Sequence, residues 1–265
     1  MSSNFIIDKF LALSKPVKGL SDFKKNAPLP SLYDFPEVYE MVYPGHKGDK
    51  VYYSNVTTKG KCLYLGIGTG RIFSEICKNN PYAFGLDNSK RMVKKMLLRN
   101  PHISEKKIIF ANVLSANIQK NSFDKIIAPF SFLTQFDPSG VKQILDNVHR
   151  WLKPKGVFYT DLFSPFFNPP VGHNYEIKKY RIGKEISVVQ KLFYNFVNQR
   201  LLEITEVKRN SEEFSVVLPL YFYFPNELVR ICNECGFTVE SLKGDYSKKD
   251  FSENHQTMVI CLRKR

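Results

Sequence analysis

Short apolar runs alternate with helix-like stripes of apolar residues along most of this chain. The runs have the length of buried strands, whereas in the stripes apolar residues recur every three or four positions, as in amphipathic helices. The alternation extends from residue 62 to residue 162 and resumes after residue 224. Strands that alternate with helices form parallel sheets, so the pattern predicts an α/β fold with a doubly wound sheet of seven strands. The predicted strands, with the exit loop of the fourth, are 62–65, 82–87, 107–110, 122–132, 157–162, 237–242 and 256–262.

Residues 163–224 interrupt this alternation. Three strand-like runs follow a proline-rich loop, at 185–197, 201–209 and 213–224. The third run contains Pro219, which cannot donate a ladder hydrogen bond and therefore predicts an edge strand. We interpret the segment as an antiparallel β insertion that covers the active site and shapes the substrate pocket. A structural flap or a dimer surface is the alternative.

The first 58 residues precede the alternating pattern. Residues 1–30 form a lead segment with a short amphipathic helix, which serves as a lid, an oligomer contact or a loosely ordered arm. A second helical stretch covers 32–43 and a third covers 50–56. The predicted organisation is thus an N-terminal arm and helical cap over 1–58 and a single domain over 59–265.

The stretch 62–73 carries the strongest local signal. A buried strand leads into Gly66, Gly68 and Gly70, and a helical pattern follows at once. Glycines in such a turn let the backbone bend sharply and let a nucleotide-like ligand approach where a Cβ would block it. The spacing is G-x-G-x-G, because Arg71 occupies the place of the third glycine of the dinucleotide motif. A turn without a ligand is the alternative.

Asp87 ends the second predicted strand, 17 residues after Gly70. A carboxylate at the tip of that strand can accept hydrogen bonds from both hydroxyls of a ribose. Asn88 and Ser89 then offer an N-cap to the next helix. The alternative is that Asp87 only caps that helix.

Leu65-Gly66-Ile67-Gly68-Thr69-Gly70-Arg71, followed by Gly85-Leu86-Asp87-Asn88-Ser89, resembles the first two motifs of class I S-adenosylmethionine-dependent methyltransferases. The resemblance covers residues 30–265, because the later segments also occur in the family's order. It implies that the final strand runs antiparallel in the sheet. One departure is visible: the family usually has an acid two residues before the first glycine, where this chain has Tyr64.

The resemblance implies S-adenosylmethionine as the cofactor. Asn112, after the third strand, corresponds to the side chain that reads the adenine amino group, although a turn asparagine is the alternative. Pro129 and Phe130 follow the fourth strand, whose carboxyl end faces the ligand crevice of a doubly wound sheet. The complete set of expected cofactor-binding residues is Tyr33, Leu65, Gly66, Gly68, Gly70, Arg71, Asp87, Asn88, Met92, Asn112, Val113, Pro129 and Phe130.

Three residues are candidates for a catalytic role. Tyr39 belongs to a segment that resembles the cap helix of small-molecule methyltransferases, and we expect it to contact both cofactor and acceptor; packing on the core is the alternative. Asp161, near the carboxyl end of the fifth strand, and His173 are the candidate proton acceptors. A loop acid that caps a backbone turn is the alternative for Asp161.

The net charge of +14 raises the question of a nucleic-acid partner. The lysines come as scattered pairs, and no long basic tract appears, so a solvated surface is the preferred interpretation. A broad basic groove for a duplex is the alternative.

The remaining composition indicates a cytoplasmic protein with no metal site. Five cysteines, an odd number, fall in predicted strands or helices and are expected to be reduced thiols. No apolar run has the length of a membrane span, and no signal-peptide pattern is visible.

The sequence therefore predicts an S-adenosylmethionine-dependent methyltransferase that transfers a methyl group to a small molecule by in-line displacement, with a homodimer left open. A nucleic-acid methyltransferase and a non-catalytic binder with the same fold are the alternatives. The G-x-G-x-G spacing disfavours a nicotinamide-dependent oxidoreductase.

Overall fold

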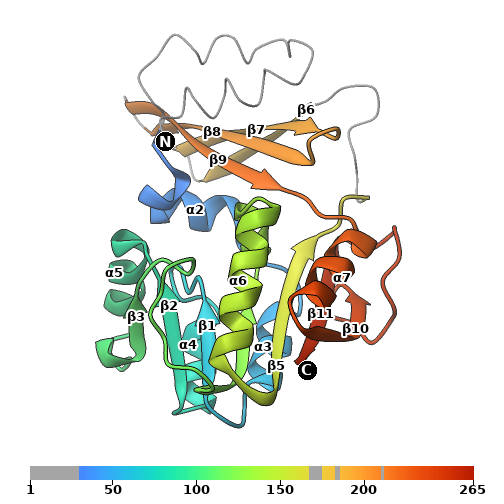
Figure 1. Ribbon diagram of the computed structural model, residues 1–265. Helices are drawn as coiled ribbons and strands as arrows, with labels where there is room; N and C mark the ends of the chain where they lie inside the picture. Colours follow the sequence, from blue (N-terminus) through green and yellow to red (C-terminus); the bar gives the residue numbers. More distant parts are fainter. Residues whose placement is uncertain (1–29, 167–174, 183–185, 210–211) are drawn as a thin grey trace. The chain divides into compact units, whose positions relative to one another are not determined.

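The computed structural model describes residues 30–166, 175–182, 186–209 and 212–265. The described residues form two compact units (Figure 1). Unit 1 contains residues 30–43 and the described residues between 175 and 222. Unit 2 contains residues 44–166 and 223–265. The predicted helix in residues 1–30 and His173 lie outside the described residues, apart from Pro30 itself.

Unit 2 is built around a seven-stranded sheet in the order β10-β11-β5-β4-β1-β2-β3. β1 pairs in parallel with β2 and β4, and the outer pairs β2–β3 and β4–β5 are also parallel. β11 is antiparallel to both of its neighbours. The doubly wound sheet and its reversed final strand are therefore confirmed. The strands are β1 Cys62–Leu65, β2 Ala83–Asp87, β3 Ile108–Phe110, β4 Phe123–Ala128, β5 Leu152–Phe163, β10 Phe237–Gly244 and β11 Thr257–Lys264.

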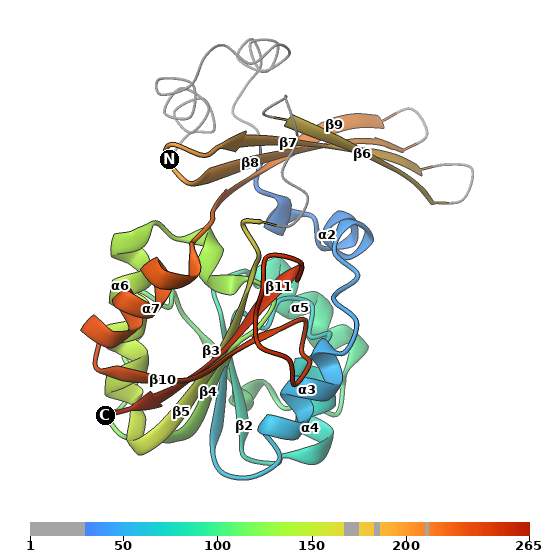
Figure 2. The same cartoon turned by 90° about the vertical axis from the view of Figure 1, so that its right-hand side faces the viewer.

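Helices cover both faces of this sheet (Figure 2). α3 (Asp49–Val56), α4 (Phe73–Asn79) and α5 (Lys90–Arg99) lie on one face. α6 (Pro138–Trp151) and α7 (Pro225–Glu234) lie on the other, and short 3₁₀ turns occupy Glu105–Lys107 (η3) and Phe132–Gln135 (η4).

Side chains cap two helices of unit 2. The Asp137 side chain accepts a hydrogen bond from the Gly140 N–H at the start of α6, and Ser89 accepts one from the Met92 N–H at the start of α5. Within the described ranges, none of the helices has the length and apolar character of a membrane span.

Unit 1 carries a separate four-stranded antiparallel sheet in the order β6-β7-β8-β9. The strands are β6 Tyr175–Ile182, β7 Ile186–Asn195, β8 Arg200–Arg209 and β9 Glu212–Tyr221. β9 is an edge strand of this sheet, as Pro219 predicted, and Ser31 forms an isolated bridge with Val217 on its outer side. The sequence predicted the last three strands but not β6, because Lys178 and Lys179 break its apolar alternation.

The segment before unit 2 packs on the β sheet of unit 1. It contains η2 (Leu32–Asp34) and α2 (Pro36–Val42), and its buried residues join those of the sheet in one apolar cluster. The members of this cluster are Leu32, Val38, Val42, Val188, Val207, Val216 and Leu218. Residues 30–43 thus group with the β insertion, whereas α3, which the predicted boundary at residue 58 assigned to the cap, belongs to unit 2.

Candidate active site

A tight turn after β1 forms the floor of the candidate site. Its glycines, Gly66, Gly68 and Gly70, all have positive φ angles, between 54° and 82°. A Cβ at Gly66 would overlap the ring of Phe132, and one at Gly70 would overlap the Met96 side chain. A Cβ at Gly68 would meet nothing within 4 Å. The turn is therefore packed against protein at both ends and open at its centre.

Asp87 lies beside this opening, at the end of β2. One carboxylate oxygen accepts a hydrogen bond from the Gly68 N–H at 2.8 Å, and the other accepts one from the Ser89 N–H at 2.8 Å. Burial raises the pKa of Asp87, although backbone N–H donors oppose that rise. The second motif of the sequence is thus joined directly to the first.

Two of the expected cofactor residues follow β3 at the same edge of the sheet. Asn112 is exposed, and its side-chain oxygen accepts a hydrogen bond from the Leu114 N–H at 2.9 Å. This hydrogen bond is that of a turn asparagine, the alternative given above for Asn112. A contact between Asn112 and adenine stays a prediction. Val113 is buried, and its carbonyl accepts a hydrogen bond from the Asn147 side chain at 3.0 Å.

These residues fit the adenosine part of S-adenosylmethionine. An open glycine turn and a carboxylate at the end of the adjacent strand are the two features that a ribose requires at this edge of a parallel sheet. The other expected cofactor residues of unit 2 occupy the same edge: Leu65 ends β1, Asn88 follows β2, Pro129 and Phe130 follow β4, and Met92 is buried in α5. Tyr33 and Tyr39 belong to unit 1.

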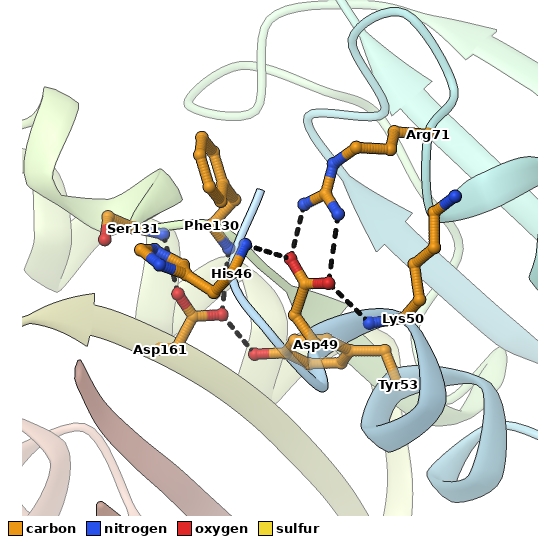
Figure 3. A network of polar contacts seen from close by, with 8 residues as sticks. All are labelled: His46, Asp49, Lys50, Tyr53, Arg71, Phe130, Ser131 and Asp161. Atoms are coloured by element: carbon orange, nitrogen blue, oxygen red, sulfur yellow. Dashed lines mark hydrogen bonds and ion pairs between the residues drawn. The ribbon is translucent and has the colours of Figure 1, made fainter. Parts of the chain in front are cut away.

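Asp161 is fully buried on β5 and fixes the loop that follows β4 (Figure 3). One of its oxygens accepts hydrogen bonds from the Phe130 N–H at 2.8 Å and from the Tyr53 hydroxyl at 2.5 Å. The other accepts one from the Ser131 N–H at 2.9 Å. Phe130 and Ser131 have φ angles of 60° and 54°. Side chains other than glycine rarely adopt such angles, so Asp161 stabilises an otherwise unfavourable backbone.

These contacts favour a positioning role for Asp161. Burial raises its pKa, while the Tyr53 hydroxyl and the two backbone donors oppose the rise. Its role as a proton acceptor stays a prediction of the sequence.

A second buried carboxylate, Asp49 at the start of α3, holds the arginine that follows the glycine turn. Its two oxygens accept hydrogen bonds from the Arg71 guanidinium at 3.0 Å and 2.5 Å. The backbone N–H groups of His46 and Lys50 donate to the same carboxylate. Burial would raise the pKa of Asp49, but the hydrogen bonds and charge of Arg71 outweigh it and lower the pKa.

Arg71 also connects the two loops of the site. Its guanidinium carbon lies 5.3 Å from the centre of the Phe130 ring, which is within cation–π range. The His46 ring lies 5.0 Å from the same ring on centroids. Figure 3 shows this set of side chains, which spans the start of α3, the glycine turn, the β4 loop and β5.

Sequence reasoning missed Asp49, Tyr53 and His46. Asp49 left one signal, since it is the only acid between Glu40 and Glu75. Tyr53 left none, because its partner lies 108 residues away along the chain.

The sequence profile of a methyltransferase domain matches residues 62–156, the segment that supplies the glycine turn, Asp87 and the β4 loop. This chain therefore contains a segment that matches the methyltransferase domain family. The resemblance of its first two motifs is thereby confirmed, and S-adenosylmethionine is the cofactor of the family.

One curated relative resembles part of this chain in sequence, and solved structures resemble its fold. Phosphoethanolamine N-methyltransferase 1 of Zea mays is 25% identical over 126 residues, which are 47% of this chain. The match spans only 23% of that relative's length. Among solved structures, an S-adenosylmethionine-dependent methyltransferase from Clostridium acetobutylicum aligns with a TM-score of 0.74 and 16% identity, over 87% of this chain and 98% of its own. The amino pentose methyltransferase CalS10 from Micromonospora echinaspora aligns with a TM-score of 0.66 and 15% identity, over 86% and 97%.

The chain departs from the usual pattern of the methyltransferase family at Tyr64, and the structure shows what that side chain does. Tyr64 is buried on β1 and packs edge-on against Phe73, with 6.1 Å between ring centroids. It therefore belongs to the core, and Asp49, through Arg71, is an acid near the turn that Tyr64 does not replace.

The packing of the glycine turn predicts different outcomes for two alanine substitutions. Both Gly68→Ala and Gly70→Ala place a side chain at positive φ, but only Gly70→Ala also overlaps Met96. We expect Gly70→Ala to lower the free energy of unfolding by about 1–3 kcal/mol more than Gly68→Ala, because overpacking adds to the backbone strain. Gly68→Ala should instead weaken S-adenosylmethionine binding, since its methyl group projects into the open centre of the turn. Urea unfolding and calorimetry measure the two effects, and equal destabilisation by both variants would contradict this account of the turn.

Asp161 and Tyr53 should behave as one unit in a double-mutant cycle. Asp161→Asn disturbs a buried acceptor of three hydrogen bonds, and we expect a loss of about 2–4 kcal/mol in the free energy of unfolding. Tyr53→Phe removes one donor and should cost about 1–2 kcal/mol. The double variant should lose at least 0.5 kcal/mol less than the sum, roughly the size typical of residues in direct contact. Strict additivity in denaturant unfolding would show that the two groups act independently.

Proposed function

We propose that this chain transfers the methyl group of S-adenosylmethionine to a small-molecule acceptor. The observation that carries the proposal is the open glycine turn joined to Asp87, within the segment that matches a methyltransferase domain. The printed names of its relatives support the acceptor class. They include a phosphoethanolamine N-methyltransferase, an amino pentose methyltransferase and a sugar N-methyltransferase, all of which act on small molecules.

The cofactor is held, in this proposal, along the carboxyl ends of the parallel strands. Asp87 accepts hydrogen bonds from the ribose hydroxyls, because its two carboxylate oxygens can accept about four hydrogen bonds and receive backbone bonds from Gly68, Asn88 and Ser89 here. Asn112 and Val113 lie against the adenine. Arg71 binds the carboxylate of the methionine end, since a guanidinium has enough donors to hold Asp49 and a second carboxylate together.

S-adenosylmethionine supplies an electrophilic methyl group on its sulfonium. The residues of the chain then need to orient the acceptor in line with that methyl group and exclude water. Such positioning can lower a barrier by roughly 7–11 kcal/mol. The Phe130–Ser131 loop, held by Asp161 and Tyr53, is the positioning element that follows β4 in this proposal.

The roles of Tyr33 at the cofactor and of Tyr39 at both cofactor and acceptor stay predictions, as does that of His173. We likewise propose, from the sequence alone, that the β insertion covers the active site. Its sheet supplies many aromatic and aliphatic side chains, which suit a compact and partly apolar ligand.

Removing the Asp87 charge should weaken cofactor binding without unfolding the chain. Asp87→Asn keeps the shape of the side chain but loses a charge-assisted hydrogen bond to the ribose, worth roughly 1.5–3 kcal/mol. We expect the dissociation constant of S-adenosylmethionine to rise at least tenfold by calorimetry. Asp124→Asn is the matched control, because Asp124 binds Lys61 and Lys153 near the opposite end of the sheet. An unchanged constant in Asp87→Asn would place the ribose elsewhere.

The class of acceptor can be decided by a turnover assay with radiolabelled cofactor. We expect methyl transfer to a member of a panel of small amines, alcohols and amino sugars, with a rate that depends weakly on salt. A nucleic-acid methyltransferase would instead act on RNA or DNA, and its binding would fall steeply between low and moderate salt. Turnover with nucleic acid alone would show that the net charge of +14 was the better guide. Cofactor binding without turnover on any acceptor would favour a non-catalytic binder.

A further inference from the structure

Glu203 is a buried acid on the sheet of unit 1, and no role in methyl transfer has been assigned to it. It lies on β8, and its side chain is 2% exposed. The Tyr43 hydroxyl donates a hydrogen bond to one carboxylate oxygen, and Thr205 donates one to the other at 3.2 Å. The Gln190 side chain also hydrogen-bonds to this carboxylate. Glu203 therefore joins the end of α2 to the middle of the sheet.

All of these donors are neutral, and the surroundings are largely apolar. Thr205 and Val207 follow Glu203 on the same face of β8, and Leu218 lies directly opposite on β9. Burying a carboxylate in such a place costs several kcal/mol unless a cation compensates for the lost water. The positive charge of Lys178 favours the ionised form of Glu203. Among the described residues, however, no cation donates a hydrogen bond to the Glu203 carboxylate. Burial therefore raises the pKa of Glu203, while the hydrogen bonds from Tyr43, Gln190 and Thr205 and the charge of Lys178 oppose that rise.

Three tyrosines form a row of ring contacts that ends at Tyr43, the tyrosine that donates to this carboxylate. The ring centroids of Tyr33 and Tyr39 are 5.8 Å apart, and those of Tyr39 and Tyr43 are 5.3 Å apart. The rings are tilted by 45° and 49° rather than stacked, so their faces point in different directions. All three residues are partly exposed, whereas the carboxylate that Tyr43 contacts is buried.

Aromatic faces and a carboxylate together recognise one kind of chemical group. The electron-rich faces of tyrosine attract cations, and clusters of such rings bind organic ammonium groups. A negative charge among the rings strengthens the attraction and repels phosphate or carboxylate groups. A neutral sugar or alcohol would gain nothing from a negative charge on Glu203, whereas an ammonium group would favour the ionised form of this acid.

We propose that Tyr33, Tyr39, Tyr43 and Glu203 form a binding site for an organic ammonium group within unit 1, and that the methyl acceptor carries this group. The first clause concerns binding alone. The second clause rests on the proposed function, because it identifies the bound molecule as an acceptor.

Two matched pairs of probes test the site in the full-length wild-type chain. Choline is compared with its neutral isostere 3,3-dimethylbutan-1-ol, and butylammonium is compared with butan-1-ol, by calorimetry in the presence of S-adenosylhomocysteine. We expect the ammonium member of at least one pair to bind at least tenfold more tightly than its neutral partner. Equal affinities in both pairs, or no saturable binding of either ammonium compound, would overturn the proposal.

Variants locate the effect on Glu203. Glu203→Gln keeps the size and the hydrogen-bonding capacity of the side chain but removes its charge, and should weaken the ammonium probe at least tenfold. Glu206→Gln is the control on the same strand, since its partly exposed carboxylate pairs with Lys191 at 2.7 Å. We expect it to change the affinity less than twofold. Thermal unfolding of both variants checks the fold. If Glu203→Gln does not fold, the affinities of the wild-type chain for the two probe pairs test the ammonium site on their own.

A turnover assay separates the two clauses. Ammonium binding with methyl transfer to amine-bearing acceptors supports both. Ammonium binding in a chain that transfers no methyl group would leave the site standing and overturn the proposed function. Methyl transfer to a neutral acceptor, with no preference for either ammonium probe, would leave the function standing and overturn the ammonium site.

Discussion

The hydrogen bonds to the Asp161 carboxylate are the constraint on which the site of unit 2 depends. Asp161 is inaccessible to water, so its charge is stabilised only by the donors that the fold brings to it. Two of them are consecutive backbone N–H groups, of Phe130 and Ser131, which can both point at one carboxylate because both residues have positive φ. The unfavourable backbone and the buried charge therefore stabilise each other. Each would cost roughly 1–3 kcal/mol or more if it stood alone.

Through Tyr53, the same carboxylate extends this order to α3. That helix begins with Asp49, which holds Arg71 beside the glycine turn. The turn after β1, the loop after β4 and the start of α3 are thus connected through two buried acids (Figure 3). Substituting any one of these groups should change the effect of substituting the others, because residues in one hydrogen-bond network do not contribute additively to the free energy of unfolding.

The sequence predicted those parts of the structure that depend on local residue patterns. The order of strands and helices, the glycine turn, Asp87 and the cap at Ser89 depend on residues that are near one another in the chain. The tail from α7 to β11 followed from resemblance to the family. By contrast, Tyr53 meets Asp161 across 108 residues, and Tyr43 meets Glu203 across 160. Nothing in the composition or spacing of either segment specifies its partner. Strand β6 was missed for a related reason, since its pairing with β7 and not its own pattern makes it a strand.

Asp161 and Glu203 show how the same chemical group can serve two purposes. Asp161 receives backbone donors, which are fixed by the fold, and it has the character of a structural anchor. Glu203 receives side-chain donors from Tyr43, Thr205 and Gln190, and partly exposed tyrosine rings lie next to it. Side-chain donors can rearrange when a ligand arrives, whereas backbone donors cannot do so without moving a loop. This difference is why the ammonium site is assigned to the second carboxylate and not to the first.

The net charge of +14 carries little of this information, because most charged side chains among the described residues are not buried. Pairs such as Lys208–Glu213 and Arg230–Glu234 are largely exposed on both sides, and exposed pairs of this kind contribute about 0–1 kcal/mol each. In our proposals, the charges that act on ligands are few and buried: Asp87 and Asp49 beside the glycine turn, and Glu203 on the sheet of unit 1. All three are acids in a basic chain. Their effect on a ligand depends on distance and burial, so the sign of the net charge does not predict the sign of the molecule that the chain binds.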